Sequence, residues 1–275
     1  MVMVKLFWIE LQQRKGALIR WTIALSFFGT IYIILYPNLP AEMREINPQA
    51  LALLQSIGMQ TFATFEGWIL ATEFNVLPLI ASLCGLFMGV GSLAAEEEQG
   101  TLELLASLPI SRLSIILAKA SAMIVAIIFA LMIVGIIAGL MLIGLQIETS
   151  VTFFDLFMAI LSHWIMGLFF MSLSLFLGAY LPNRNSTLVA GMGYLLVSFF
   201  GENLAGMAPV LDAYRPFFAF YYFKRVVTIL TGELVWADIG ILIGASMLFL
   251  ILAILSFHRR NLTVQAWPWQ RPRIE

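Results

Sequence analysis

Charge is missing from long stretches of this chain. The run from 76 to 95 contains no Asp, Glu, Lys or Arg, and about 20 such residues can form a helix that crosses a lipid bilayer. Over the whole chain, 61% of the residues are hydrophobic and 11% are charged, against about 45–50% and about 25% in an average soluble domain. This balance nearly excludes a soluble enzyme, a nucleic-acid binder or a disordered chain, and predicts an integral membrane protein.

Six apolar segments predict an all-α polytopic membrane protein that forms a single domain over residues 1–275. The third segment is too long for one perpendicular crossing, so its first turns are expected to lie in water around Lys119. The fifth is short, because Glu202 and Asn203 interrupt it. The predicted transmembrane helices cover 17–36, 76–95, 115–145, 157–181, 187–201 and 239–257.

Lys and Arg residues flank these spans unevenly. With six spans, eleven basic residues fall on the side that carries both termini, and four fall on the other side. Because cytoplasmic loops carry the excess of Lys and Arg, both termini are predicted to be cytoplasmic, in a protein of the cell (inner, cytoplasmic) membrane.

Two segments outside the spans have the pattern of membrane interfaces. In 1–16, apolar residues recur at helical spacing from Val4 to Leu11, which favours a helix lying in the cytoplasmic interface over a frayed start. Residues 202–238 carry six aromatic side chains within seven positions, which predicts short helices that re-enter the outer leaflet. Residues 37–73 are expected to form a mildly acidic external loop.

The spans offer little chemistry. His163 is the one mid-span ionisable candidate, and a hydrogen bond to a neighbouring helix is favoured over a catalytic role. The sequence has no zinc-hydrolase helix, no serine-hydrolase elbow and no phosphate loop, so we expect a chain that is not an enzyme and binds neither ATP nor a metal. Cys84 is the only cysteine, which excludes an internal disulfide.

Two of the predicted spans each contain a pair of glycines that are four residues apart. These pairs are Gly85 with Gly89 and Gly135 with Gly139. Small residues at this spacing allow two membrane helices to approach closely, but glycine is also generally common in such helices. Both readings stay open from the sequence.

The most informative stretch is residues 96–112, called the signature segment below. It reads Glu-Glu-Glu-Gln-Gly-Thr-Leu-Glu-Leu-Leu-Ala-Ser-Leu-Pro-Ile-Ser-Arg. Gly100 permits a sharp turn, and the leucines after it give a short helix an apolar surface outside the bilayer. Pro109 ends that helix, and Ser111 can cap the next one. An acidic, partly apolar helix facing the cytoplasm suits docking to another protein, and a solvated loop is the alternative.

The signature segment resembles the corresponding stretch of permease subunits of the type-2 ABC exporter family. The matching residues are Glu96, Gly100, Thr101, Leu102, Glu103, Leu104, Leu105, Pro109, Ile110, Ser111 and Arg112. The six-span layout, the interfacial helix and the external re-entrant segment extend the resemblance over most of the chain. The stretch 64–67 gives a weaker likeness to the antibiotic-exporter branch.

The resemblance implies a permease that binds two copies of a separate ABC ATPase, in which ATP and Mg²⁺ would bind. It also implies a second permease copy, with a homodimer favoured over a heterodimer, and contact with membrane lipid but not nucleic acid. In the family, the signature segment forms a coupling helix that docks on the ATPase. We carry this role onto residues 100–112 and onto Glu96, Glu97 and Glu98, and the resemblance assigns no substrate-binding residue.

The predicted function is therefore ATP-driven export of a hydrophobic or amphipathic cargo such as a drug, antibiotic, peptide or lipid. An apolar path is expected because the predicted spans are almost free of charge. The alternative is a sensor or signalling subunit that regulates an ATPase and transports nothing. A membrane enzyme acting on lipids would need a polar catalytic cluster, which the sequence does not offer.

Overall fold

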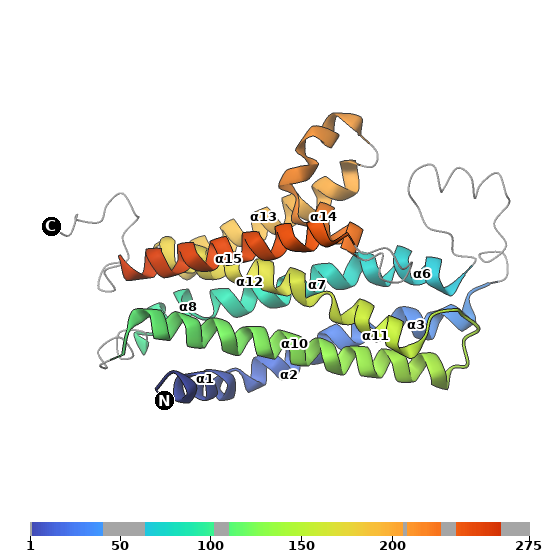
Figure 1. Cartoon of the computed structure of the whole chain (residues 1–275), viewed down its shortest axis with the longest axis horizontal. Helices are drawn as coiled ribbons and strands as arrows, with labels where there is room; N and C mark the ends of the chain where they lie inside the picture. Colours follow the sequence, from blue (N-terminus) through green and yellow to red (C-terminus); the bar gives the residue numbers. More distant parts are fainter. Residues whose placement is uncertain (1, 41–63, 102–109, 206–207, 227–234, 260–275) are drawn as a thin grey trace.

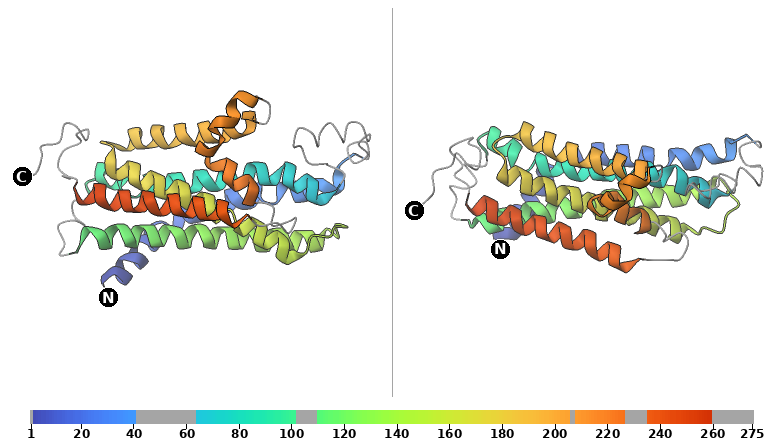
Figure 2. Two further views of the ribbon diagram at one scale, coloured as in Figure 1. Left: turned by 45° about the horizontal axis from the view of Figure 1, so that its top comes forward. Right: turned by 90° about the horizontal axis from the view of Figure 1, so that it is seen from above.

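The computed structural model describes residues 2–40, 64–101, 110–205, 208–226 and 235–259. Within these ranges every regular element is helical, and six helical segments are long and apolar enough to cross a membrane. They run side by side as one bundle (Figures 1 and 2). The predicted all-α polytopic fold is confirmed.

Each predicted span corresponds to one of these segments. The first comprises α2 (Lys15–Phe28), α3 (Ile31–Leu35) and η1 (Tyr36–Asn38), and the second comprises α6 (Phe65–Ala71), α7 (Glu73–Val90) and α8 (Ala94–Glu98). The third is α10 (Arg112–Gly144), and the fourth comprises α11 (Phe153–Leu161) and α12 (Trp164–Tyr180). The fifth is α13 (Arg184–Ala205) and the sixth is α15 (Trp236–His258). A further helix, α1 (Val2–Gln13), precedes the first span.

Helix α12 is the central element of the bundle. It packs against α7 and α15, and also against α10 and α13. In the fourth segment, 78% of the most apolar stretch of 18 residues is buried within the bundle, whereas the corresponding share of α15 is 17%. The outer face of α15 is therefore left for lipid. Phe170 and Met171, both fully buried on α12, lie in the core between these helices.

The glycine pairs lie at close helix contacts. A methyl group on Gly85 would lie 2.1 Å from the carbonyl oxygen of Gly167 on α12, and one on Gly89 would lie 2.7 Å from that of Met171. Gly135 and Gly139 on α10 leave room for phenylalanine rings of α11. Both glycine pairs therefore allow two helices to approach closely, because a side chain at any of the four positions would meet atoms of the neighbouring helix.

The second span begins earlier than the sequence indicated, which corrects part of the predicted loop 37–73. Thr64 caps α6 by accepting a hydrogen bond from the Gly67 amide at 3.2 Å. Phe65, Trp68 and Ile69 then lie at helical spacing and are buried, so this stretch is part of the bundle. The rest of that predicted loop, 41–63, lies outside the described residues.

The fifth span is longer than predicted, because Glu202 and Asn203 do not interrupt it. The Glu202 carboxylate accepts hydrogen bonds from Arg215 at 2.8 and 3.2 Å, and Asn203 donates to the Phe199 carbonyl of its own helix. The bonded carboxylate raises the pKa of Arg215, which stays charged. The ion pair with Arg215, thirteen residues later in the chain, thus allows the Glu202 carboxylate to be buried near the end of α13.

Short helices follow α13 in the segment predicted to re-enter the outer leaflet. η2 (Pro209–Phe217) leads into α14 (Ala219–Val226), which turns back onto the bundle beside α15 (Figure 1). The ring of Phe223 is buried and packs edge-on against the ring of His163, with 5.0 Å between centroids. His163 lies at the break between α11 and α12, so α14 packs against the point where the fourth span is interrupted.

Candidate functional site

Four charged side chains meet at one end of the bundle and form the ion-pair quartet: Glu10, Arg14, Glu96 and Lys119. The Lys119 ammonium donates to Glu10 at 2.5 Å and to both carboxylate oxygens of Glu96 at 2.7 Å. Arg14 lies 3.3 Å from Glu10 and 3.5 Å from Glu96. Two acids and two bases thus neutralise one another across α1, α8 and α10.

The quartet is shielded from water. The Lys119 side chain is 1% exposed and that of Glu10 is 6% exposed. This corrects the expectation that the first turns of α10 lie in water around Lys119. Removing charges from water has a large free-energy cost that only close opposite charges can offset, so each member of the quartet depends on the others.

Glu96 is the member of the quartet that belongs to the signature segment. Its carboxylate points inward to Lys119 and Arg14, and its side chain is 19% exposed. The beginning of the signature segment is therefore tied to the N-terminal helix and to α10. Arg14 adds a bond from its guanidinium to the Met88 carbonyl at 3.1 Å, near the C-terminal end of α7, where carbonyls lack helical partners.

Two more residues of the signature segment bind helix ends. Glu98 accepts a hydrogen bond from the amide of Arg184, the first residue of α13, at 3.2 Å. Arg112 donates to the carbonyls of Phe257 and His258 in the last turn of α15, at 2.9 and 3.1 Å. A carboxylate at a helix N-terminus and a guanidinium at a C-terminus both match the helix dipole. The two ends of the segment thus hold the N-terminal end of α13 and the C-terminal end of α15.

The turn residues behave as their types predict. Gly100 has a φ of +70°, a conformation that glycine adopts without strain, and the Thr101 hydroxyl donates to the Glu96 carbonyl at 3.1 Å. The Ser111 side chain accepts from the Ser114 amide at 3.1 Å and caps α10, as predicted. Of the other predicted docking residues, Glu97 lies on α8, whereas Leu102, Glu103, Leu104, Leu105 and Pro109 lie outside the described residues.

Sequence reasoning missed Glu10, Arg14 and Lys119 as parts of this site. Two signals were available: Lys119 is a lone cation within an apolar run, and Glu10 and Arg14 are four residues apart on one helical face. A lone charge in a membrane helix calls for a partner, but nothing local shows that this partner sits 109 residues earlier.

The described helices also contain buried acids that the shorter predicted spans left out. Glu73 is fully buried at the start of α7, and its carboxylate oxygens accept no hydrogen bond from any residue within the described ranges. His163 is fully buried too, and its Nδ1 bonds to the Ala159 and Ile160 carbonyls in the last turn of α11. The predicted bond from His163 to a neighbouring helix is thus replaced by bonds to the preceding turn.

Glu73 gives a stability prediction with a matched contrast. Glu73→Met is expected to raise the free energy of unfolding by about 1–3 kcal/mol, because it removes a buried group that has no hydrogen-bond donor. Glu66→Met is expected to lower it by about 1–3 kcal/mol, because Glu66 accepts bonds from the Thr149 and Ser150 hydroxyls at 2.7 and 2.8 Å. Thermal unfolding of the purified variants measures both, and a destabilised Glu73→Met would contradict the assignment.

A comparison with protein-family models identifies the family of this chain. The model of the ABC-2 family transporter protein matches residues 4–262, which is nearly the whole chain. No curated protein matches it. Members of this family are membrane transport components that work with an ABC ATPase and are not catalytic themselves. With six apolar helices and a family match from α1 past α15, this multi-pass chain belongs to the ABC-2 transporter family, as a membrane permease of an ABC transporter.

Proposed function

We propose that this permease is the membrane subunit of an ATP-driven exporter, and that a separate ATPase docks on its signature segment. Both termini would then be cytoplasmic, on the side where eleven of the fifteen basic residues fall. Two ATPase copies, each binding ATP and Mg²⁺, would serve two permease copies, with a homodimer as the simplest assembly.

One observation carries the proposal. The two ends of the signature segment contact α10, α13, α15 and the junction between α1 and α2. Glu96 pairs with Lys119 on α10 and with Arg14 at that junction, Glu98 reaches α13, and Arg112 reaches α15. A solvated loop without a mechanical role would need none of these bonds. A displacement of the segment by a closing ATPase would be transmitted directly to the ends of those helices.

This arrangement supports a rigid-body mechanism. The ion pairs of Lys119 are short and its side chain is buried, and the bond from Arg112 to the Phe257 carbonyl is partly buried. These contacts resist local deformation and move their helices together. ATP-driven closure of the ATPase pair would push both signature segments, and the spans would open a path outward. Hydrolysis would reset them.

The nature of the cargo follows from the charge of the spans. The charged residues of the quartet are paired with one another, and Glu202 is paired with Arg215. Glu73 has no such partner within the described ranges, but no group of three or more acids, histidines or cysteines there could hold a metal ion. A hydrophobic or amphipathic cargo, such as a drug, antibiotic, peptide or lipid, therefore fits better than a bare ion.

Docking is tested by replacing one acidic and one apolar residue of the signature segment with lysine. The double variant Glu103→Lys/Leu104→Lys is expected to reduce co-purification with the co-expressed ABC ATPase by about thirtyfold or more, the effect of losing one interface hot spot. Gln12→Lys/Gln13→Lys is the control, because both glutamines are exposed on α1 and the same number of lysines is added outside the segment. Undiminished association of the first variant would refute the docking role.

Transport is tested separately in sealed vesicles that contain the permease and its ATPase. An exporter is expected to move a hydrophobic or amphipathic probe against its gradient when ATP is supplied on the cytoplasmic face. Hydrolysis that responds to external ligands without movement of any probe would favour the sensor subunit instead.

A further inference from the structure

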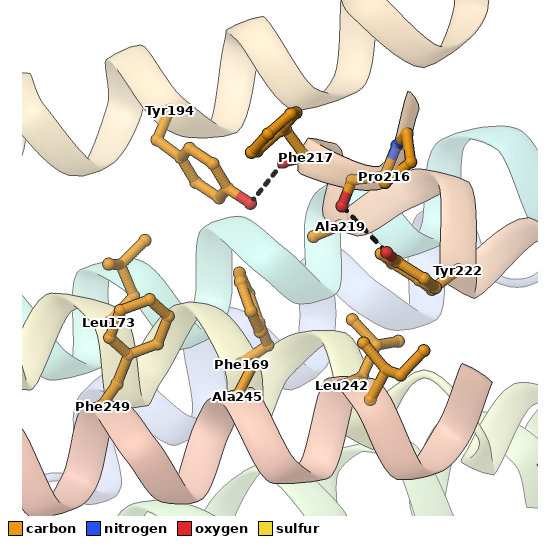
Figure 3. Close-up of a pocket in the computed structure, with 11 residues that line it drawn as sticks. Phe169, Leu173, Tyr194, Pro216, Phe217, Ala219, Tyr222, Leu242, Ala245 and Phe249 are labelled. Atoms are coloured by element: carbon orange, nitrogen blue, oxygen red, sulfur yellow. Dashed lines mark hydrogen bonds between the residues drawn. The ribbon is translucent and has the colours of Figure 1, made fainter. Parts of the chain in front are cut away.

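A cavity of about 360 Å³ lies between α12, α13, α15 and the η2–α14 turn (Figure 3). This volume is within the range of small-molecule sites. Of the eleven residues that line it, only Tyr194 and Tyr222 carry a polar side-chain atom. The remaining wall consists of rings and aliphatic groups, among them Phe169 on α12 and Phe249 on α15.

The two tyrosine hydroxyls are already engaged. Tyr194 donates to the Phe217 carbonyl at 3.0 Å, and Tyr222 donates to the Pro216 carbonyl at 2.9 Å, as the dashed lines in Figure 3 mark. These bonds hold the η2–α14 turn over the cavity and use the only hydroxyl hydrogens of its lining. A polar or charged group inside would have to give up its bonds to water without receiving equivalent ones, so the occupant must be apolar.

The rim of the cavity carries exposed apolar side chains. Phe217 is 72% exposed and Ile241 is 46% exposed, and both line the cavity. Helix α15 is the least buried of the six spans, so its outer face and this rim meet the hydrocarbon of the bilayer. The apolar molecules that surround such a rim are acyl chains.

We propose that this cavity is a binding site for an acyl chain, enclosed between the fourth and sixth spans and closed by the η2–α14 turn. The chain lies along Phe169 and Phe249, and its polar end remains outside the lining, beyond Pro216. There the charged Arg215, paired with Glu202 and Asp212, marks the change from an apolar to a polar environment. The site holds an acyl chain whether or not the permease exports a cargo.

The probe for this site is a phosphatidylcholine with a photoreactive diazirine near the middle of one acyl chain, incorporated into vesicles with the intact permease. Illumination followed by mass spectrometry of peptides is expected to place the label on α12 and α15 residues of the lining, such as Leu173 and Ala245. Label spread evenly over exposed positions of α15, such as Ile251 and Leu255, would overturn the proposal.

A cavity-filling variant gives the second measurement. Ala245→Phe is expected to reduce labelling of the lining about tenfold, the effect of removing the contacts of roughly two methylene groups. Ala237→Phe is the matched control, because Ala237 is exposed on the same helix and does not line the cavity. Equal labelling of the two variants would overturn the proposal, and the peptide map of the unmodified protein decides the question if Ala245→Phe does not fold.

A second arm identifies the source of the chain. The same diazirine on a free fatty acid is added to vesicles made of unlabelled phospholipid. Labelling of the lining by the phospholipid probe alone indicates a resident membrane lipid, and labelling by the fatty acid indicates a single-chain ligand. Both results support an acyl-chain site, whereas failure of both probes to label the lining overturns it.

Discussion

Lys119→Met is expected to lower the free energy of unfolding by about 3–5 kcal/mol, which would be the largest effect of any single charge removal in this permease. The substitution leaves Glu10 and Glu96 buried with only Arg14 to balance them. Methionine fills nearly the same volume, so the loss reports the uncompensated charge and not a cavity. Thermal unfolding of the purified protein in detergent measures the change.

Charge balance provides a sharper test than the single variant. Lys119→Met combined with Glu96→Gln restores a net charge of zero in the quartet, and this double variant is expected to be more stable than Lys119→Met alone. Lys5→Met is the control, because Lys5 is exposed on α1 and its removal costs the same formal charge. If the double variant lost the sum of the two single effects, the ion pairs would not be the source of the stability.

Gly85→Ala is expected to have the second large effect. The added methyl group would lie 2.1 Å from the Gly167 carbonyl oxygen, and a backbone atom in a buried helix cannot move aside without moving α12. Overpacking of this kind costs about 1–3 kcal/mol and occasionally more, and here it acts on the contact between the central helix and α7. A lower yield of monodisperse protein and a lower unfolding temperature are the expected observations.

Gly244→Ala is the matched control for this prediction. Gly244 lies on α15, and a methyl group there would meet nothing within 4 Å, so this variant is expected to stay within about 0.5 kcal/mol of the unmodified protein. Equal losses from Gly85→Ala and Gly244→Ala would contradict the prediction, because alanine favours a helix over glycine at both positions and only Gly85 lies at a close helix contact.

The fold could be predicted largely because the signal for a span is local. About 20 apolar residues are sufficient to specify a transmembrane helix, and all six expected spans are present. The turn at Gly100 and the cap at Ser111 were predictable for the same reason, since each depends on one residue and its immediate neighbours. The ends of the spans were less accurate where a distant partner decides them, as Arg215 does for Glu202.

The site was only half predictable from the sequence. The resemblance pointed to the signature segment, but the direction in which Glu96 faces depends on Lys119 and Arg14, which come from other helices. A run of three glutamates looks the same in a sequence whether its members face a partner protein or the interior. Placing these side chains required the three-dimensional arrangement of α1, α8 and α10.

The quartet also constrains the order of events during synthesis. Glu10 is made 109 residues before its buried partner Lys119, and two of the six spans lie between the two residues. Until then, the Glu10 carboxylate on α1 lacks its buried partner, so α1 stays at the membrane surface. Helix α1 is thus fixed in its final position only once the third span is inserted.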